Sequence, residues 1–199
     1  MHLNLFRIAY PVTSLGPGQR VVAWVAGCRR RCPGCISPEM RDPAVGNLIE
    51  VSVLADHLTA LPHALNGITI SGGEPFAQAD ALAALLYAVR QRQPDWNVII
   101  YSGYRLSTIR RNPAMRHLLA ETDILIDGRY RQEVAATHPL AGSGNQAIHF
   151  RSLRGKAMMS LLEDTEPISP VLGIGRGGEN HLLIGVPNPS QQVTFGKAW

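Results

Sequence analysis

The chain has 199 residues, of which 45% are hydrophobic and 17% are charged, and its formal net charge is +4. This length fits one domain with at most a small appendage, and the composition is too apolar for wholesale disorder. No apolar run approaches the roughly 20 residues that cross a membrane, and residues 1–7 lack the character of a signal peptide. We therefore expect a cytoplasmic protein without membrane association. The positive charge suits nucleic acid or an acidic protein partner, but with 6% aromatic residues and no long basic helix we do not expect nucleic-acid binding.

Predicted strands alternate with predicted helices over the first 150 residues. Short apolar runs predict strands at 21–26, 67–71, 98–101, 124–126 and 147–150. Apolar residues at helical spacing predict helices over 51–61, 82–89 and 106–120, the last interrupted at Pro113. This βαβ alternation predicts a mostly parallel sheet, and about five units are too few for a closed eight-stranded barrel. We expect an α/β fold built as a partial (β/α) barrel.

The chain changes character beyond about residue 154, where prolines and glycines interrupt it repeatedly. Two apolar runs, 182–186 and 192–195, flank the segment Pro187-Asn188-Pro189 and predict a β-hairpin-like C-terminal extension. We expect a partial-barrel domain over 1–153 and an extension of unknown role over 154–199.

All three cysteines lie within eight residues, as Cys28-x-x-x-Cys32-x-x-Cys35. An odd number this closely spaced is a poor disulfide framework, and clustered thiols in a cytosolic protein indicate a metal site. Thiolates favour Fe–S clusters, zinc or Cu(I). Zinc is the weaker alternative, because structural zinc takes four protein ligands and none of the seven histidines lies in this loop. On a [4Fe-4S] cluster, three thiolates leave one iron open, whereas electron carriers usually have cysteine on every iron. The number of cysteines therefore favours a cluster that can bind a substrate.

A glycine-rich turn, Ser71-Gly72-Gly73-Glu74-Pro75, follows the second predicted strand and precedes a helix. As a simple βα turn it uses glycines for backbone geometry and Pro75 to begin the helix. No Gly-Lys-Ser/Thr follows, which argues against a phosphate-binding P-loop. Beside a metal cluster, the glycines would also let a ligand approach the backbone, and Glu74 suits a cationic amino group. Both motifs are expected at carboxyl ends of strands, where parallel α/β folds build their sites.

Together the two motifs resemble the radical S-adenosylmethionine (SAM) superfamily. The resemblance implies a [4Fe-4S] cluster on Cys28, Cys32 and Cys35, whose open iron binds the amino and carboxylate groups of SAM. It also implies reductive cleavage of SAM to methionine and a 5′-deoxyadenosyl radical, with no protein side chain acting as acid or base. The residues implied to bind or order SAM come from the cysteine loop, the glycine turn and two later segments: Gly34, Cys35, Ile36, Gly72, Gly73, Glu74, Asp127 and Asn145.

Further motifs narrow this resemblance. Gly16-Pro17-Gly18-Gln19-Arg20 precedes the first predicted strand, and the segments 101–104, 125–130 and 144–146 follow in order. Over roughly residues 5–152 they are similar to the activating proteins of anaerobic (class III) ribonucleotide reductase. That family takes hydrogen from a glycine of the large reductase subunit, which would be the partner here. Two features depart from the pattern of that family. Position 36, directly after the third cysteine, is Ile36 here, whereas the family often has an aromatic residue there, and the C-terminal extension has no recognised counterpart.

An electron donor is also needed for this chemistry. Arg29, Arg30 and Arg31 lie inside the cysteine loop, either as ordinary surface arginines or, as we expect, to dock an acidic flavodoxin or ferredoxin. Two other functions stay open: a radical SAM enzyme that acts on a peptide or small metabolite, and an Fe–S or zinc module that does not turn over SAM.

Overall fold

The structure is a computed structural model that describes residues 1–163, 173–177 and 180–184. Its strands are β1 (His2–Val12), β2 (Arg20–Val25), β3 (Asn47–Glu50), β4 (Gly67–Gly72), β5 (Asn97–Ser102), β6 (Ile124–Asp127), β7 (Ala147–Phe150), β8 (Gly173–Gly177) and β9 (Asn180–Ile184). Its helices are α1 (Val51–Thr59), α2 (Ala79–Arg92), α3 (Leu106–Arg111), α4 (Pro113–Ala120), α5 (Leu153–Ala157) and α6 (Met159–Glu163), with short 3₁₀ turns η1 (Pro38–Arg41), η2 (Pro43–Val45) and η3 (Pro75–Gln78). Within these residues, no helix has both the length and the apolar character that a membrane span requires.

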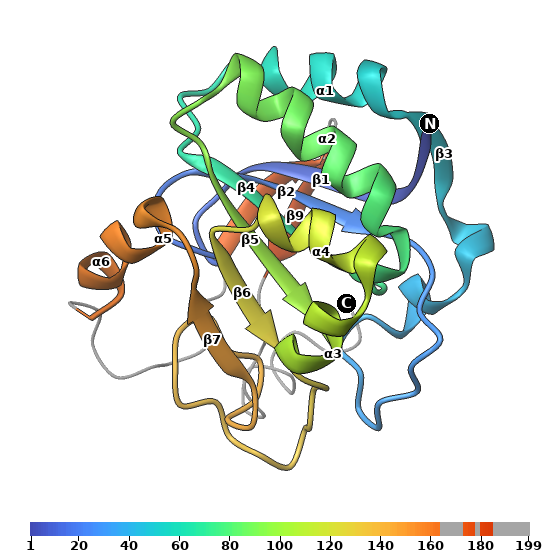
Figure 1. Ribbon diagram of the computed structural model, residues 1–199, viewed down its shortest axis with the longest axis vertical. Helices are drawn as coiled ribbons and strands as arrows, with labels where there is room; N and C mark the ends of the chain where they lie inside the picture. Colours follow the sequence, from blue (N-terminus) through green and yellow to red (C-terminus); the bar gives the residue numbers. More distant parts are fainter. Residues whose placement is uncertain (164–172, 178–179, 185–199) are drawn as a thin grey trace.

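One twisted sheet organises the protein (Figure 1), with strand order β7-β6-β5-β4-β2-β1-β8-β9 and β3 paired with β1 beside this path. The middle strands β2, β4, β5 and β6 are parallel, whereas β1 and β7 pair antiparallel on either side. The two end strands, β7 and β9, do not pair with each other in the described part of the chain. The predicted α/β partial barrel is therefore confirmed, with its parallel strands confined to the middle.

Alternate residues of the strands face two different cores, as β5 shows. Ile100 packs into the core formed with α1, α2 and α4, and these helices lie together on one face of the sheet (Figure 1). Ile99 points the other way and packs with Met158 and Leu162, which follow β7. Because both faces are covered, the parallel strands are continuous apolar runs rather than alternating ones.

The C-terminal hairpin continues the sheet beyond β1. β8 and β9 pair antiparallel, and β8 meets β1 at Tyr10 and Arg176. Ile184 is 5% exposed and packs against Ala9, Val12 and Val22, and its carbonyl accepts a hydrogen bond from Ser14 Oγ at 2.9 Å. The hairpin-like extension is thus confirmed, although the partner strand seen is β8; the predicted partner at 192–195 lies outside the described residues. The division of the chain at residue 153 stays a prediction.

Candidate functional site

The three cysteines lie on an irregular loop that leaves β2 at the carboxyl edge of the parallel strands. The first residues of the loop are hydrogen-bonded to its last residues: Gly27 N donates to Met40 O and Cys28 N donates to Arg41 O, both at 2.9 Å. Farther along, Arg41 Nη2 donates to Cys32 O at 3.0 Å. All three thiols are free and partly exposed. The loop is therefore closed at its base while its thiols stay accessible.

The thiol donors fit an Fe–S cluster by their chemistry. Three soft ligands stand on one short loop, and the chain has no fourth cysteine. Burial raises the pKa of the Cys28 thiol, and its contact with the backbone of Arg30 opposes that shift. Among the described residues, no three His, Cys, Asp or Glu side chains converge as ligands of a metal ion.

The glycine turn packs directly on the start of the cysteine loop. Gly73 N donates to Val25 O at 2.7 Å, and Glu74 N donates to Gly27 O at 2.9 Å. A Cβ atom at Gly73 would lie 2.4 Å from Gly27 O, and one at Gly72, whose φ is +103°, would lie 2.6 Å from Val25 N. Both glycines are thus required for the contact between two backbones. The structure brings the two sequence motifs side by side.

Glu74 is the centre of this site and is only 3% exposed. Its Oε1 accepts hydrogen bonds from Ser102 Oγ at 2.8 Å and Phe76 N at 3.1 Å. Its Oε2 accepts from Gly103 N at 2.9 Å and Arg30 Nε at 3.3 Å. Burial raises the pKa of Glu74, and these four donors oppose the rise. The carboxylate therefore joins the end of β4, the end of β5 and the cysteine loop.

Arg30 does not lie on the surface as the sequence suggested. Its side chain is 16% exposed and forms an ion pair with Glu74, and its guanidinium carbon lies 3.9 Å above the centre of the Tyr104 ring. Arg29 and Arg31 are exposed. The charged group of Arg30 is therefore already engaged within the protein, which leaves Arg29 and Arg31 as the exposed arginines of the run; docking of an electron donor there stays a prediction.

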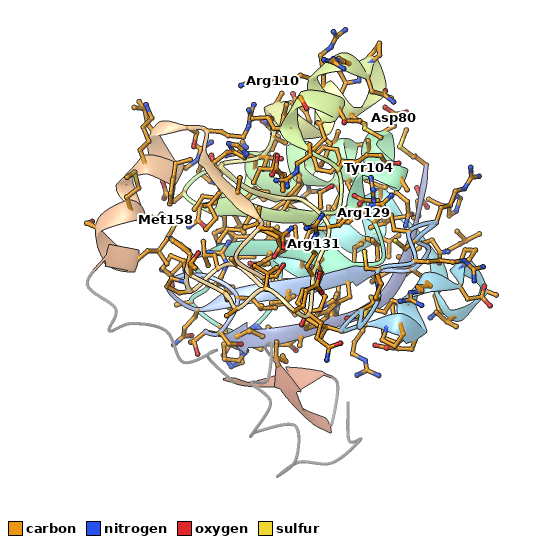
Figure 2. All side chains as sticks on the ribbon, turned by 90° about the horizontal axis from the view of Figure 1, so that it is seen from below. Asp80, Tyr104, Arg110, Arg129, Arg131 and Met158 are labelled. Carbon is orange, nitrogen blue, oxygen red and sulfur yellow. The ribbon has the colours of Figure 1, made fainter. Side chains whose placement is uncertain are left out.

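The loop between β6 and β7 covers the cysteine loop from the other side. Gly34 has a φ of +64°, and a Cβ atom there would overlap the side chain of Gln132. Burial raises the pKa of Tyr130, and the neighbouring Cys35 and Glu133 add to the rise. Ile36 is half-buried. Figure 2 looks onto this edge of the molecule and labels Tyr104, Arg129 and Arg131 there.

Asp127 ends β6 at the same edge and is buried. Its Oδ2 accepts a hydrogen bond from Leu106 N at 2.5 Å, so it holds the start of α3. Arg105 Nη1 lies 3.3 Å from Oδ1, and His149 Nε2 lies 3.2 Å from Oδ2. Asp127 therefore has protein partners for both oxygens in this structure.

Asn145 lies in the loop before β7, and its Nδ2 donates to Arg129 O at 2.8 Å. Its Oδ1 is buried without a hydrogen-bond partner among the described residues. A buried acceptor of this kind has capacity for one more donor. Of the two weaker candidates, Asn145 keeps an open polar atom and Asp127 does not.

Sequence reasoning missed two groups that organise the site. Ser102 and Gly103 hold the Glu74 carboxylate, and Arg41 holds the carbonyl of Cys32. The first pair had a signal, because Ser102-Gly103 ends the strand next to β4, and neighbouring parallel strands end at one edge. No sequence signal indicated the role of Arg41, since nothing in the spacing of the cysteines predicts that the loop folds back on itself.

Comparison with known protein families shows first which class of domain the chain carries, and then which family it belongs to. The family described as "4Fe-4S single cluster domain" matches residues 14–149, so the chain carries such a domain. The anaerobic ribonucleoside-triphosphate reductase-activating protein of Vibrio cholerae is 31% identical over 148 residues, which cover 70% of this chain and 94% of that protein. The protein of that name from enterobacteria phage T4 is 29% identical over 152 residues, 73% of this chain and 93% of its own length. The chain belongs to the family of anaerobic ribonucleoside-triphosphate reductase-activating proteins.

Proposed function

We propose that this protein is a radical SAM activase that forms a glycyl radical on the large subunit of an anaerobic ribonucleotide reductase or a similar partner. The observation that carries the proposal is a loop with three cysteines and no fourth, packed against the Gly72–Glu74 turn, in a chain of this family. A cytoplasmic location belongs to the same proposal, because thiols stay reduced there.

In this proposal, Cys28, Cys32 and Cys35 hold the [4Fe-4S] cluster. When bound, the cluster and SAM supply the reductive cleavage that yields the 5′-deoxyadenosyl radical. The protein's own part is to bind and orient, so no side chain is assigned a proton transfer. The residues proposed to surround SAM are Gly34, Cys35, Ile36, Gly72, Gly73, Glu74, Asp127 and Asn145.

The identity of the radical acceptor is open to a second candidate. The relatives match over 93–94% of their own length but cover only 70–73% of this chain. The extension, whose Ile184 packs on β1 and β2, lies beyond residue 149, where the match to the family model ends. This observation supports, as the alternative, a radical SAM enzyme whose acceptor is a peptide or small metabolite.

The proposal is tested on full-length protein, reconstituted anaerobically with iron and sulfide and reduced chemically in the presence of SAM. We expect 5′-deoxyadenosine from the wild type and none from Cys28→Ser. Ser37→Ala, two residues beyond the last cysteine, is the control and should behave as the wild type. Adding a partner with a glycyl-radical segment should give an EPR doublet on that partner. A bound cluster without 5′-deoxyadenosine would indicate a non-catalytic Fe–S module, and 5′-deoxyadenosine without the doublet would favour the alternative acceptor.

We also propose that an acidic flavodoxin or ferredoxin delivers the electron at the exposed Arg29 and Arg31. Reversing both charges (R29E/R31E) should slow reduction by such a donor and weaken its dependence on ionic strength, since complementary charge mainly raises the association rate. Stopped-flow absorbance measures this rate. Chemical reduction should be unchanged, as should both rates in Arg116→Glu on the exposed surface of α4. Wild-type rates with the protein donor in R29E/R31E would contradict the proposal.

A further inference from the structure

Arg30 is placed where it can control the shape of the cysteine loop. It lies midway between Cys28 and Cys32, and it is the arginine of the 29–31 run that turns into the protein rather than toward solvent. The backbone bonds of Gly27 and Cys28 and the Arg41 side chain fix the loop at residues on either side of it. Arg30 is therefore the side chain that ties the intervening segment to the strands.

The slot that receives Arg30 has three sides, all built from strand ends. The ring of Tyr104 lies beneath the guanidinium at 3.9 Å, and the Glu74 carboxylate meets its Nε at 3.3 Å. Gly103 forms the wall, because a Cβ atom there would lie 2.6 Å from Arg30 Cδ and 2.8 Å from Arg30 Nε. The slot thus needs a glycine at position 103 and a carboxylate at position 74.

Hydrogen bonds connect the walls of the slot to one another. Gly103 N and Ser102 Oγ donate to the same carboxylate, and Ser102 Oγ also accepts from Tyr104 N at 3.0 Å. The carboxylate, its donors and the aromatic ring therefore form one connected unit at the end of β5. A planar guanidinium can stack on a ring and meet a carboxylate together, whereas a lysine offers only a point charge.

We propose that Arg30 is a positioning residue that locks the segment between Cys28 and Cys32 onto the Glu74–Tyr104 unit, so that the loop retains its metal cluster and presents it beside the Gly72–Glu74 turn. Retention of the cluster concerns the cysteine loop alone. Presentation of the cluster beside the Gly72–Glu74 turn rests on the proposed function, because SAM is proposed to bind at that turn.

The test compares full-length wild type, Arg30→Met and Arg31→Met after anaerobic reconstitution. Arg31 is exposed on the same loop and gives a control of equal size and charge. Iron transfer to a chelator is followed by absorbance. We expect Arg30→Met to lose iron about 10-fold faster than wild type, as when other groups that orient metal ligands are removed. Arg31→Met should lose iron at the wild-type rate.

A second readout is the EPR spectrum of the chemically reduced cluster with and without SAM. The change that SAM produces in wild type should persist in Arg31→Met and be reduced in Arg30→Met. If wild type itself shows no change with SAM, the proposed function fails, while the iron-transfer comparison still tests the role of Arg30.

Two outcomes would overturn the proposal: Arg30→Met retaining iron as well as wild type, or Arg31→Met losing iron as fast as Arg30→Met. If circular dichroism shows that Arg30→Met does not fold, Arg30→Lys and Tyr104→Leu replace it. Each keeps part of the slot and should lose iron faster than wild type while folded. Wild-type iron retention in both would equally overturn the proposal.

Discussion

Changing Glu74 to glutamine is expected to lower the free energy of unfolding of the metal-free protein by about 3 kcal/mol and, if the proposed function holds, to abolish the proposed SAM cleavage by the loaded protein. The carboxylate accepts four hydrogen bonds, two on each oxygen. A glutamine amide has one acceptor oxygen, so its NH₂ group must face either Phe76 N–H or the donors from Gly103 and Arg30. Ser102 can turn its hydroxyl to accept, but a backbone N–H cannot. A buried donor is then left without a partner, which costs about 1–3 kcal/mol, and the ion pair with Arg30 is lost as well.

Urea unfolding of the metal-free variant measures the first effect, and 5′-deoxyadenosine formation measures the second. Glu133→Gln, an exposed acid in the loop after β6, is the matched control and should change neither. Glu74→Gln and Arg30→Met should also couple, because they remove two ends of one contact, with an interaction energy of about 1–2 kcal/mol in a double-mutant cycle. Strictly additive effects, or a Glu74→Gln variant as stable as wild type, would contradict the role given to the carboxylate.

The helices and the parallel strands were predictable because their signals are local. Helical spacing located α1 and α2, and Pro113 separates α3 from α4 where the sequence indicates. β1 was missed because its pairing with β2 shifts register between Leu5 and Arg7 and again between Ala9 and Val12, which breaks the alternation of a regular strand. The sequence analysis assigned no direction to β7, which pairs antiparallel with β6, because a strand's own sequence does not state its direction.

Only the features of the site that follow from the strand topology were predictable from the sequence. Parallel neighbours end at one edge, so the cysteine loop after β2 and the turn after β4 had to meet. The inward turn of Arg30 was not predictable, because neighbouring loop residues follow no period and all three arginines look alike in sequence. Its partners, Glu74 and Tyr104, come from two different strand ends, and only the fold places them on one side of the loop.

The partners of Arg20, at the opposite edge of the sheet, were likewise not predictable from the sequence, because they come from different strands. Its removal is expected to have a large effect on stability. It is completely buried, and all five of its N–H groups are used. Nε donates to Thr69 Oγ1 at 2.6 Å, Nη1 donates to Asn97 Oδ1 and Pro17 O, and Nη2 donates to Ile68 O and Asn97 O. Burial lowers the pKa of Arg20 to about 9, so the side chain still carries its charge at neutral pH. One cation thus binds together the starts of β2, β4 and β5.

Arg20→Met should lower the free energy of unfolding by about 3–5 kcal/mol, because it leaves several buried acceptors without donors at once. Urea unfolding of the metal-free protein measures the loss, and Arg116→Met on the exposed surface of α4 should change it by less than about 0.5 kcal/mol. The cysteine loop follows the other end of β2, so the fraction of Arg20→Met that is folded should bind as much iron as wild type. A stability loss below about 1 kcal/mol would contradict the structural role. Loss of iron from folded Arg20→Met would show instead that the two edges of the sheet are coupled, and that the amino ends of the strands help to set the geometry of the cysteine loop.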